Sequence, residues 1–152
     1  MLRITDSNSG IYILELYAKD KFRIDIKKFQ NTILKSGFYY YIGSAQKNLS
    51  QRIERHFKTD KKIHWHIDHL TANTKVTLKK VYVLPDAPKN LEKEIANIFP
   101  EVFGGEIFLT GFGNSDTKGT ITHLFYRSKP IPHNHFSDRY QSIVSVKPSS
   151  NE

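Results

Sequence analysis

Gly10-Ile11-Tyr12 and Tyr41-Ile42-Gly43 are the two short stretches that decide the fold of this chain. Each sets an aromatic residue and an isoleucine beside a glycine, as is common where β-strands begin or end. The first opens the run 10–17, which is rich in β-branched and aromatic side chains. The second closes a similar run that starts at Phe38. Because short strands that follow one another usually pair, we expect the two runs to lie antiparallel.

Four further stretches predict strands. Phe22, Ile24 and Ile26 alternate with charged residues, which indicates a half-buried strand. The run 76–84 is also rich in strand-forming residues and is stopped by Pro85. Two shorter strands are expected at 107–109 and 121–126, on either side of a glycine-rich turn over 111–119.

Three segments predict helices. Apolar residues in 49–57 fall on one helical face, and Asn48 precedes them as a candidate N-cap. Residues 63–70 predict a short helix with Ile67 and Leu70 turned inward. The third helix begins near Asp86 and Pro88. Its expected inward side chains are Leu91, Ile95, Ile98 and Phe99.

The order of these elements predicts an α/β fold, a small sandwich in which helices flank a central and largely antiparallel sheet. At 152 residues the chain is most simply one domain. We expect the domain to occupy residues 1–128. Residues 129–152 are richer in Pro, Ser, His and Asn and predict a polar tail. That tail is either frayed or docked through Phe136, Tyr140 and Ile143.

Composition limits the compartment and the partner. The chain has no cysteine, so it has neither a disulfide framework nor a thiolate metal site. No signal peptide or long apolar run is visible, so we expect a cytoplasmic protein without a membrane partner. Lys and Arg number 23 against 15 Asp and Glu, a net charge of +8. A positive excess favours a polyanionic partner such as nucleic acid.

Several side chains suited to phosphodiester chemistry follow the two tripeptides in order. If the two strands pair, the phenols of Tyr12 and Tyr41 can enter one site. Arg52 and His56 lie one helical turn apart and point the same way, and Glu92 lies at the edge of a buried helical stripe. Such groups can hold a phosphate, orient a water and bind a cation. Taken singly, each also has a structural explanation as a core aromatic or a solvated helix residue.

The ordered set resembles the signature of the GIY-YIG nuclease superfamily, over about residues 10–127. A small prokaryotic branch of that superfamily carries a His-Trp-His-Ile-Asp run and a Gly-Phe-Gly-x-Ser-Asp…His-Leu-Phe ending. Here these are residues 64–68, 111–116 and 123–125. The resemblance implies that Tyr12 and Tyr41 orient or deprotonate the attacking water. It also implies that Arg52 holds the scissile phosphate, that His56 shares the water or the leaving group, and that Glu92 binds a single Mg²⁺ or Mn²⁺.

The function that the resemblance implies is a metal-dependent endonuclease, a hydrolase of phosphodiester bonds in nucleic acid, with DNA as the expected substrate. Candidate nucleic-acid contacts are Arg52, Arg55, Lys61 and Lys62. A phenol acts as a base only if a cation lowers its pKa, and Arg52 is the expected cation. Relatives often carry a separate DNA-binding domain, so a dimer or a targeting partner is also expected. The alternatives are a non-catalytic nucleic-acid-binding module on the same fold and a hydrolase of small phosphoesters.

The sequence leaves two questions about the expected site undecided: the role of the run 64–68 and the identity of a downstream asparagine. His64 and His66 either reach the site, with Asp68 orienting one of them, or bond backbone carbonyls while Trp65 fills the core. A zinc site there is disfavoured, because the chain lacks cysteine and histidines two apart on a helix do not share a face. Nuclease relatives also have a downstream asparagine, for which Asn114 and Asn97 are the candidates.

Overall fold

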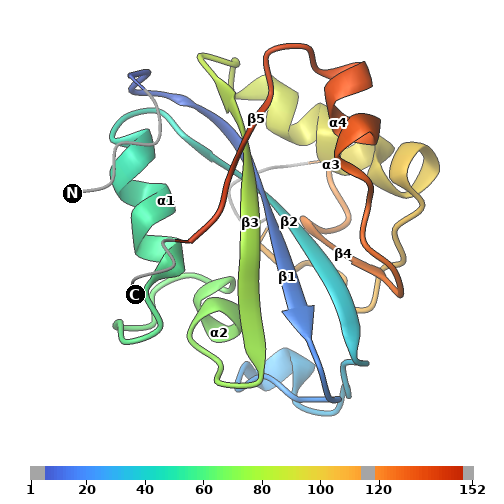
Figure 1. Cartoon of the computed structure of the whole chain (residues 1–152). Coiled ribbons are helices and arrows are strands. Elements are labelled where there is room, and N and C mark those ends of the chain that lie inside the picture. Colours follow the sequence, from blue (N-terminus) through green and yellow to red (C-terminus); the bar gives the residue numbers. More distant parts are fainter. Residues whose placement is uncertain (1–5, 114–118, 149–152) are drawn as a thin grey trace.

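The computed structural model describes residues 6–113 and 119–148, and its centre is one five-stranded antiparallel sheet (Figure 1). The strands lie in the order β4-β2-β1-β3-β5. Their bounds are Gly10–Ala18 for β1, Gly37–Ala45 for β2, Val76–Pro85 for β3, Leu124–Arg127 for β4 and Val144–Val146 for β5. The predicted α/β class with a central antiparallel sheet is confirmed.

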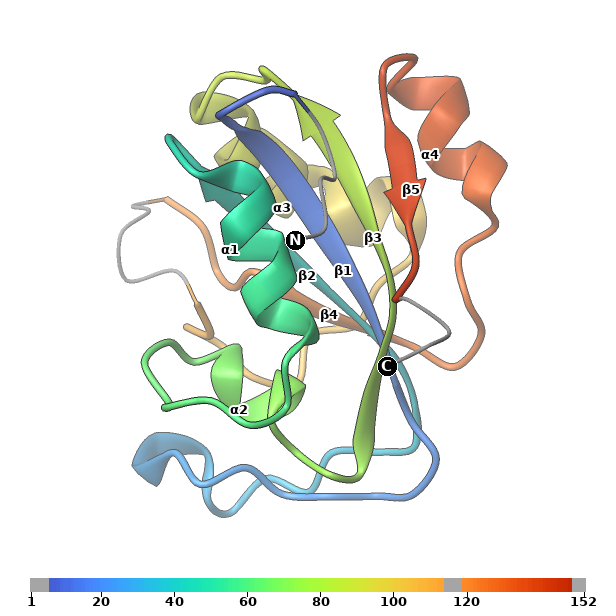
Figure 2. The same ribbon diagram turned by 60° about the vertical axis from the view of Figure 1, so that its left-hand side comes forward.

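Four α-helices cover the two faces of the sheet (Figures 1 and 2). They are α1 (Leu49–Phe57), α2 (Asp68–Thr71), α3 (Asn90–Phe103) and α4 (His133–Arg139). Leu14 and Leu16 of β1 face a core shared with α1 and α2, whereas Ile11 and Ile13 face a second core shared with α3 and α4. The alternation of side chains along each strand thus gives the sheet two buried faces.

The two tripeptides meet across the sheet as expected, because β1 and β2 pair antiparallel. In the register Tyr12 lies opposite Gly43, and Leu14 lies opposite Tyr41. Tyr12 and Tyr41 therefore sit on the same face but diagonally, two residues out of step. This offset leaves Gly43, which has no side chain, beside the ring of Tyr12.

Asn48 occupies the N-cap position of α1, but its side chain makes no capping hydrogen bond. Its backbone is left-handed (φ 57°, ψ 42°), whereas a side-chain cap needs an extended conformation. Asn8 binds the two backbone N–H groups at the very start of this helix. Its Oδ1 accepts from Asn48 N at 2.8 Å, and its carbonyl accepts from Leu49 N at 3.2 Å.

Two of the predicted strands are absent from the described residues. Phe22 and Ile24 are buried as the alternation suggested, but residues 22–26 form only one bridge, between Phe22 and Leu34. Both edges of β1, the strand that precedes this segment in the sequence, are already paired with β2 and β3, so the segment cannot pair with it. At 107–109 there is likewise no strand, and only Glu106 bridges to Tyr126.

Other elements form where expected with shorter bounds. The helix expected over 63–70 is limited to α2, residues 68–71. Ile67 and Leu70 are buried as predicted. The late strand begins at Leu124 rather than at 121. α3 starts at Asn90, four residues after Asp86, and ends where Gly104 adopts a φ of 78°.

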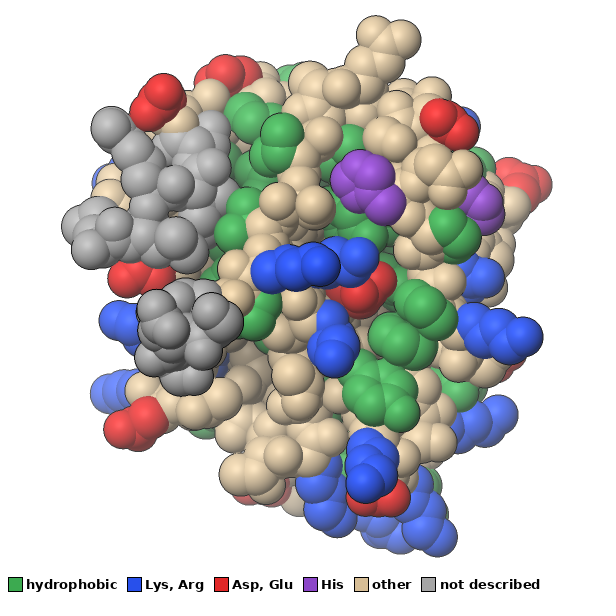
Figure 3. All heavy atoms as spheres, viewed as in Figure 1, with side chains coloured by type: hydrophobic (Ala, Val, Ile, Leu, Met, Phe, Trp, Pro, Cys, Tyr) green, Lys and Arg blue, Asp and Glu red, His purple; other side chains and the backbone are tan. Residues whose placement is uncertain are grey.

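The segment after residue 128 contributes α4 and the edge strand β5, which pairs with β3. Phe136 is fully buried and Ile143 nearly so, as the docked alternative requires. On the face seen in Figure 3, Lys and Arg side chains are spread out, with Asp and Glu among them. Within the two described ranges, no helix combines the length and apolar content needed to cross a membrane.

Candidate active site

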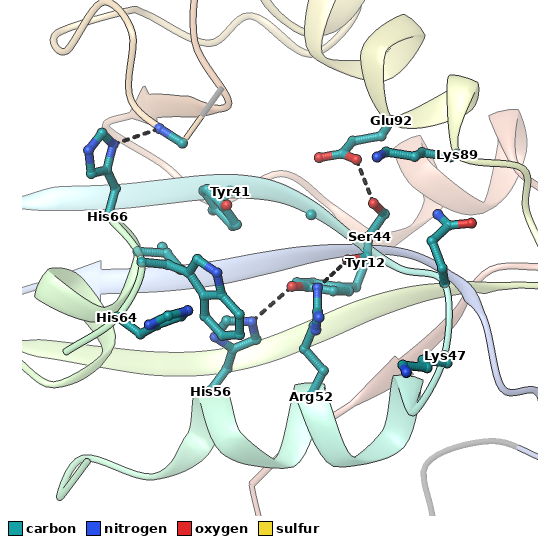
Figure 4. A pocket seen from close by; sticks show the side chains of 15 residues that line it. Tyr12, Tyr41, Ser44, Lys47, Arg52, His56, His64, His66, Lys89 and Glu92 are labelled. Carbon is teal, nitrogen blue, oxygen red and sulfur yellow. Dashed lines mark hydrogen bonds between the residues drawn. The ribbon is translucent and has the colours of Figure 1, made fainter. Parts of the chain in front are cut away.

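A pocket of about 430 Å³ opens where β1 and β2 adjoin α1 and the first turn of α3 (Figure 4). Its lining includes all five residues expected to be catalytic: Tyr12, Tyr41, Arg52, His56 and Glu92. His64 and His66 also line it. Residues separated by up to eighty positions in the sequence are therefore gathered in one place by the sheet and its two flanking helices.

Tyr12 and His56 form a buried hydrogen-bonded pair, in which the phenol oxygen and Nε2 are 2.9 Å apart. Burial lowers the pKa of His56 to about 3, and the nearby charges of Lys61, Arg55 and Arg52 act in the same direction, while Asp68 opposes them. At neutral pH the imidazole is therefore uncharged. Because the ring stays neutral, its role is to hold the Tyr12 phenol in place through the hydrogen bond, and not to carry a proton.

Both phenols of the pocket stay protonated. Burial raises the pKa of Tyr12 and of Tyr41 above the ordinary range, and nearby Glu92 adds to the effect. The positive charge of Arg52 does lower the pKa of each phenol, but by less than burial raises it, so the net shift of both pKa values is upward. The expectation that Arg52 makes either phenol a ready base is therefore wrong. In this environment the phenols act as hydrogen-bonding groups.

Arg52 extends from α1 across the pocket toward β2 (Figure 4). Its Nη1 donates to the carbonyl of Ser44 at 3.0 Å, and its guanidinium carbon lies 5.0 Å from the ring centroid of Trp65. A guanidinium has five N–H donors, so these contacts orient Arg52 and leave donors for an anionic ligand. The side chain is half-buried, so its electrostatic attraction for a bound anion is stronger than that of a fully solvated arginine.

Glu92 faces Arg52 from the first turn of α3, where a negative charge is also favoured by the helix dipole. Ser44 Oγ donates to Glu92 Oε1 at 2.5 Å, and His123 Nδ1 lies 3.2 Å from Oε2. The backbone carbonyl of Ser44 accepts from Arg52 while its hydroxyl donates to Glu92. Ser44 therefore fixes the two opposing charges of the pocket relative to each other.

Glu92 is the pocket's one acidic lining residue among those described, and nowhere in the described ranges do three His, Cys, Asp or Glu side chains gather as metal ligands. The donor set excludes a zinc-type cage but fits Mg²⁺ or Mn²⁺, which are commonly held by one or two carboxylates with waters and substrate phosphates. A carboxylate has roughly four lone-pair sites. The hydrogen bond from Ser44 and the contact with His123 therefore leave acceptor capacity for a cation.

The run 64–68 is not helical up to Ile67, so the spacing argument made for a helix does not apply to its histidines. His66 Nδ1 accepts from Gly113 N at 3.0 Å, which ties the run to the loop beside Tyr41. His64 is exposed and lies edge-on to Trp65. Among the described residues, neither imidazole donates a hydrogen bond to a backbone carbonyl. The alternative in which the two histidines are held by carbonyls is therefore wrong.

Asp68 does not orient either histidine ring. Its carboxylate accepts from Arg55 at 2.8 and 3.0 Å and from the backbone N–H groups of His64 and Trp65. Burial alone would raise the pKa of Asp68, but these hydrogen bonds outweigh it and lower the pKa. Asp68 is thus an ionised anchor for the turn, and expecting it to orient an imidazole was wrong.

Two of the expected nucleic-acid contacts are engaged within the protein. Arg55 is bound to Asp68 and to the carbonyl of Lys62. The Lys61 side chain is only 5% exposed and donates to the carbonyls of Arg55 and His56 at the end of α1. Burial lowers the pKa of Lys61 to about 8. Lys62 is exposed, and Arg52 alone of the four lines the pocket.

Sequence reasoning missed several residues in or next to the pocket. Lys47 and Lys89 line the rim, and Lys89 lies beside Glu92 (Figure 4). Ser44 follows Tyr41-Ile42-Gly43 directly, so its place next to the tripeptide was the available signal. His123 stood within the His-Leu-Phe ending but had no role. Asn114 lies outside the described residues, whereas Asn97 lines a separate small cavity on α3.

A comparison with protein-family models matches residues 11–145 to the family described as a domain of unknown function, DUF123. The chain belongs to this family. The match covers Ile11 and Tyr12 of the first tripeptide, all of the second, every residue that lines the pocket, and the chain as far as the middle of β5. No curated protein and no solved structure matches the chain. The family's description states no activity.

Proposed function

We propose that this protein is a metal-dependent nuclease that hydrolyses phosphodiester bonds in nucleic acid, with DNA as the expected substrate. The observation that carries the proposal is the arrangement of Arg52 on α1 and Glu92 on α3, both bound to Ser44, beside the hydrogen-bonded Tyr12 and His56. A cationic and an anionic group held apart in one pocket suit a phosphate with its metal ion. The resemblance to the GIY-YIG superfamily supports the same assignment.

In this proposal the scissile phosphate binds to the free N–H donors of Arg52. A guanidinium holds phosphate oxygens through paired hydrogen bonds and stabilises the charge that grows in the transition state. Lys47 and Lys89, on the rim of the pocket, bind neighbouring phosphates of the strand. Arg55 and Lys61 are not assigned to this contact, because their cations are bound to Asp68 and to the end of α1.

Glu92 would hold the single Mg²⁺ or Mn²⁺, which when bound neutralises phosphate charge and lowers the pKa of water. Tyr12 and Tyr41 orient the attacking water as neutral phenols, since burial keeps both protonated. His56 fixes the Tyr12 phenol. The water oxygen forms the new bond to phosphorus as the phosphorus–oxygen bond to the leaving group breaks. The water releases one proton to solvent and the leaving oxygen takes one up, so one water is added across the broken bond.

The test is a cleavage assay on nicked, branched and single-stranded DNA, with either Mg²⁺ or Mn²⁺ and with a chelator. Glu92→Gln should abolish metal-dependent cleavage, while Glu94→Gln, an exposed carboxylate on the same helix, should not change it. Arg52→Ala should lower the rate by about 10²–10³-fold, as removal of one transition-state donor does. Arg23→Ala serves as the matched control, because Arg23 does not line the pocket.

Cleavage at the wild-type rate by Glu92→Gln would remove the metal-bound nuclease from consideration. Salt-sensitive binding of DNA with no metal-dependent product under any condition would identify the non-catalytic binding module. Release of phosphate from mononucleotides, with no inhibition by oligonucleotides, would instead identify a hydrolase of small phosphoesters.

A further inference from the structure

We propose that His123 is a positioning residue that holds the Glu92 carboxylate in the orientation in which it binds the divalent cation. The inference rests on the proposed function, because Glu92 is the cation's ligand in that proposal. His123 precedes β4 and is fully buried, and its Nδ1 lies 3.2 Å from Glu92 Oε2. It does not line the pocket, so it can act on the cation only through Glu92.

The contacts of His123 determine which nitrogen carries the proton. Nδ1 lies within hydrogen-bond distance of Glu92 Oε2 and, at 3.1 Å, of the carbonyl of Ile42. The carbonyl is an acceptor only, so Nδ1 must carry the ring proton and donates to Ile42. The same N–H group lies beside Oε2, the oxygen of Glu92 that Ser44 does not bind. The positive end of its dipole therefore attracts that oxygen.

The backbone holds this ring in place. The carbonyl of His123 accepts from Ile42 N, and its N–H donates to the carbonyl of Phe112, each at 3.0 Å. His123 therefore adds one backbone hydrogen bond to β2 beyond the β2–β4 pairing, next to Tyr41 and Gly43. Moving the imidazole would break contacts to β2 at the point where the second tripeptide lines the pocket.

Ser44 donates to one oxygen of Glu92, and the Nδ1–H group of His123 lies against the other. A glutamate side chain has several rotamers, and ordering one on binding a cation costs free energy. Contacts made before the cation arrives lower that cost. Partners of a ligating carboxylate typically contribute about 10–100-fold to metal affinity.

Packing alone does not account for a histidine at this position. Nε2 of His123 is buried and has no hydrogen-bond partner among the described residues. An unpartnered polar atom in the interior is unfavourable, and an apolar side chain of similar size would avoid it. The donor function of Nδ1 is the gain that offsets this cost.

The experiment measures Mn²⁺ affinity by electron paramagnetic resonance, first with Mn²⁺ alone and then with a phosphorothioate oligonucleotide. His123→Leu removes the donor, whereas His123→Asn keeps an N–H at about the place of Nδ1. We expect His123→Leu to weaken Mn²⁺ binding by about 10–100-fold and His123→Asn to restore most of the affinity. His135→Leu, at an exposed histidine of α4, should leave it unchanged.

Thermal unfolding of each variant reports folding separately from affinity. If His123→Leu does not fold, the wild-type protein still provides a test, because long-range ¹H–¹⁵N NMR spectra report the tautomer of His123. An Nε2-protonated neutral ring would overturn the inference. So would a folded His123→Leu that binds Mn²⁺ as the wild type does, while Glu92→Gln does not. If Glu92→Gln binds Mn²⁺ as tightly as the wild type, the metal site of the proposed function fails and the role of His123 fails with it.

Discussion

The ring of Tyr12 lies against Gly43, its partner across the β1–β2 pairing. A Cβ atom at residue 43 would stand 2.6 Å from Tyr12 Cζ and 2.7 Å from the phenol oxygen. The glycine of the second tripeptide thus provides the space that the tyrosine of the first one occupies. That phenol is hydrogen-bonded to His56, so the space left by Gly43 also determines where the phenol oxygen lies in the pocket.

Gly43→Ala should therefore displace the Tyr12 ring. We expect a loss of about 1–3 kcal/mol in the free energy of unfolding, as for other overpacked interiors, together with a large loss of cleavage. Gly104→Ala is the matched control. Residue 104 has a φ of 78° but open space around its Cα, so alanine there is strained by about 1–2 kcal/mol without touching the pocket. Urea denaturation and cleavage rates distinguish the two variants. Normal cleavage by Gly43→Ala would contradict the prediction.

Local patterns predicted most of the sheet and helices because those elements follow from periodicity. The β-branched and aromatic runs 10–17 and 76–84 and the apolar stripe from Leu49 to Phe57 each specify an element without knowledge of its neighbours. The segment 22–26 has a clear alternation, and Phe22 and Ile24 are indeed buried. It does not pair with β1, the strand before it, because β2 and β3 already occupy both edges of β1. That competition for strand edges is a tertiary effect.

The pocket residues also fall into two groups, those that local sequence patterns predict and those whose roles depend on tertiary contacts. Tyr12, Tyr41, Arg52, His56 and Glu92 were found because each stands at a recognisable place relative to the tripeptides. The roles of Ser44 and His123 depend on how the start of α3 packs over the end of β2. Likewise, Arg55 looked like a free cation until the fold brought Asp68 to it. Contacts between distant segments decide whether a charge is available, and a single sequence does not contain them.

His56 should make the protein less stable at mildly acidic pH. The unfolded chain protonates this histidine below about pH 6.5, whereas the folded protein does so only near a pKa of about 3. Between these values the unfolded state binds more protons, so stability is complete above the upper value and falls as the pH decreases. The expected slope is at most about 1.4 kcal/mol per pH unit.

Urea denaturation between about pH 4.5 and 7.5 checks this slope against His56→Asn, which cannot titrate there. The pKa values of His66 and Asp68 are also lowered in the folded protein, but both groups are present in both proteins and cancel in the difference. The wild type should lose stability more steeply than the variant. Equal slopes would mean that His56 is readily protonated in the folded state.

Lys47 and Arg55 should differ in the salt dependence of DNA binding. Lys47 is exposed on the pocket rim, so Lys47→Met should lessen the log–log salt slope on duplex by about 0.9. Arg55 is bound to the buried carboxylate of Asp68, so Arg55→Met should leave the slope unchanged while lowering stability. Fluorescence anisotropy in the Glu92→Gln background measures binding without cleavage. A shallower slope for Arg55→Met would return Arg55 to the nucleic-acid contact.

Tyr12→Phe and Tyr41→Phe should lower the cleavage rate without moving its pH profile. Burial holds both phenols protonated well above neutral pH, so neither titrates between about pH 6 and 9. Each loses one hydrogen bond to the attacking water, which should reduce the rate by about tenfold to a hundredfold. Tyr39→Phe is the control, because its hydroxyl donates to the carbonyl of Lys35 away from the pocket. If an alkaline-rising limb in the wild-type profile disappears in Tyr12→Phe, Tyr12 is a titrating base, and the neutral-phenol mechanism is wrong.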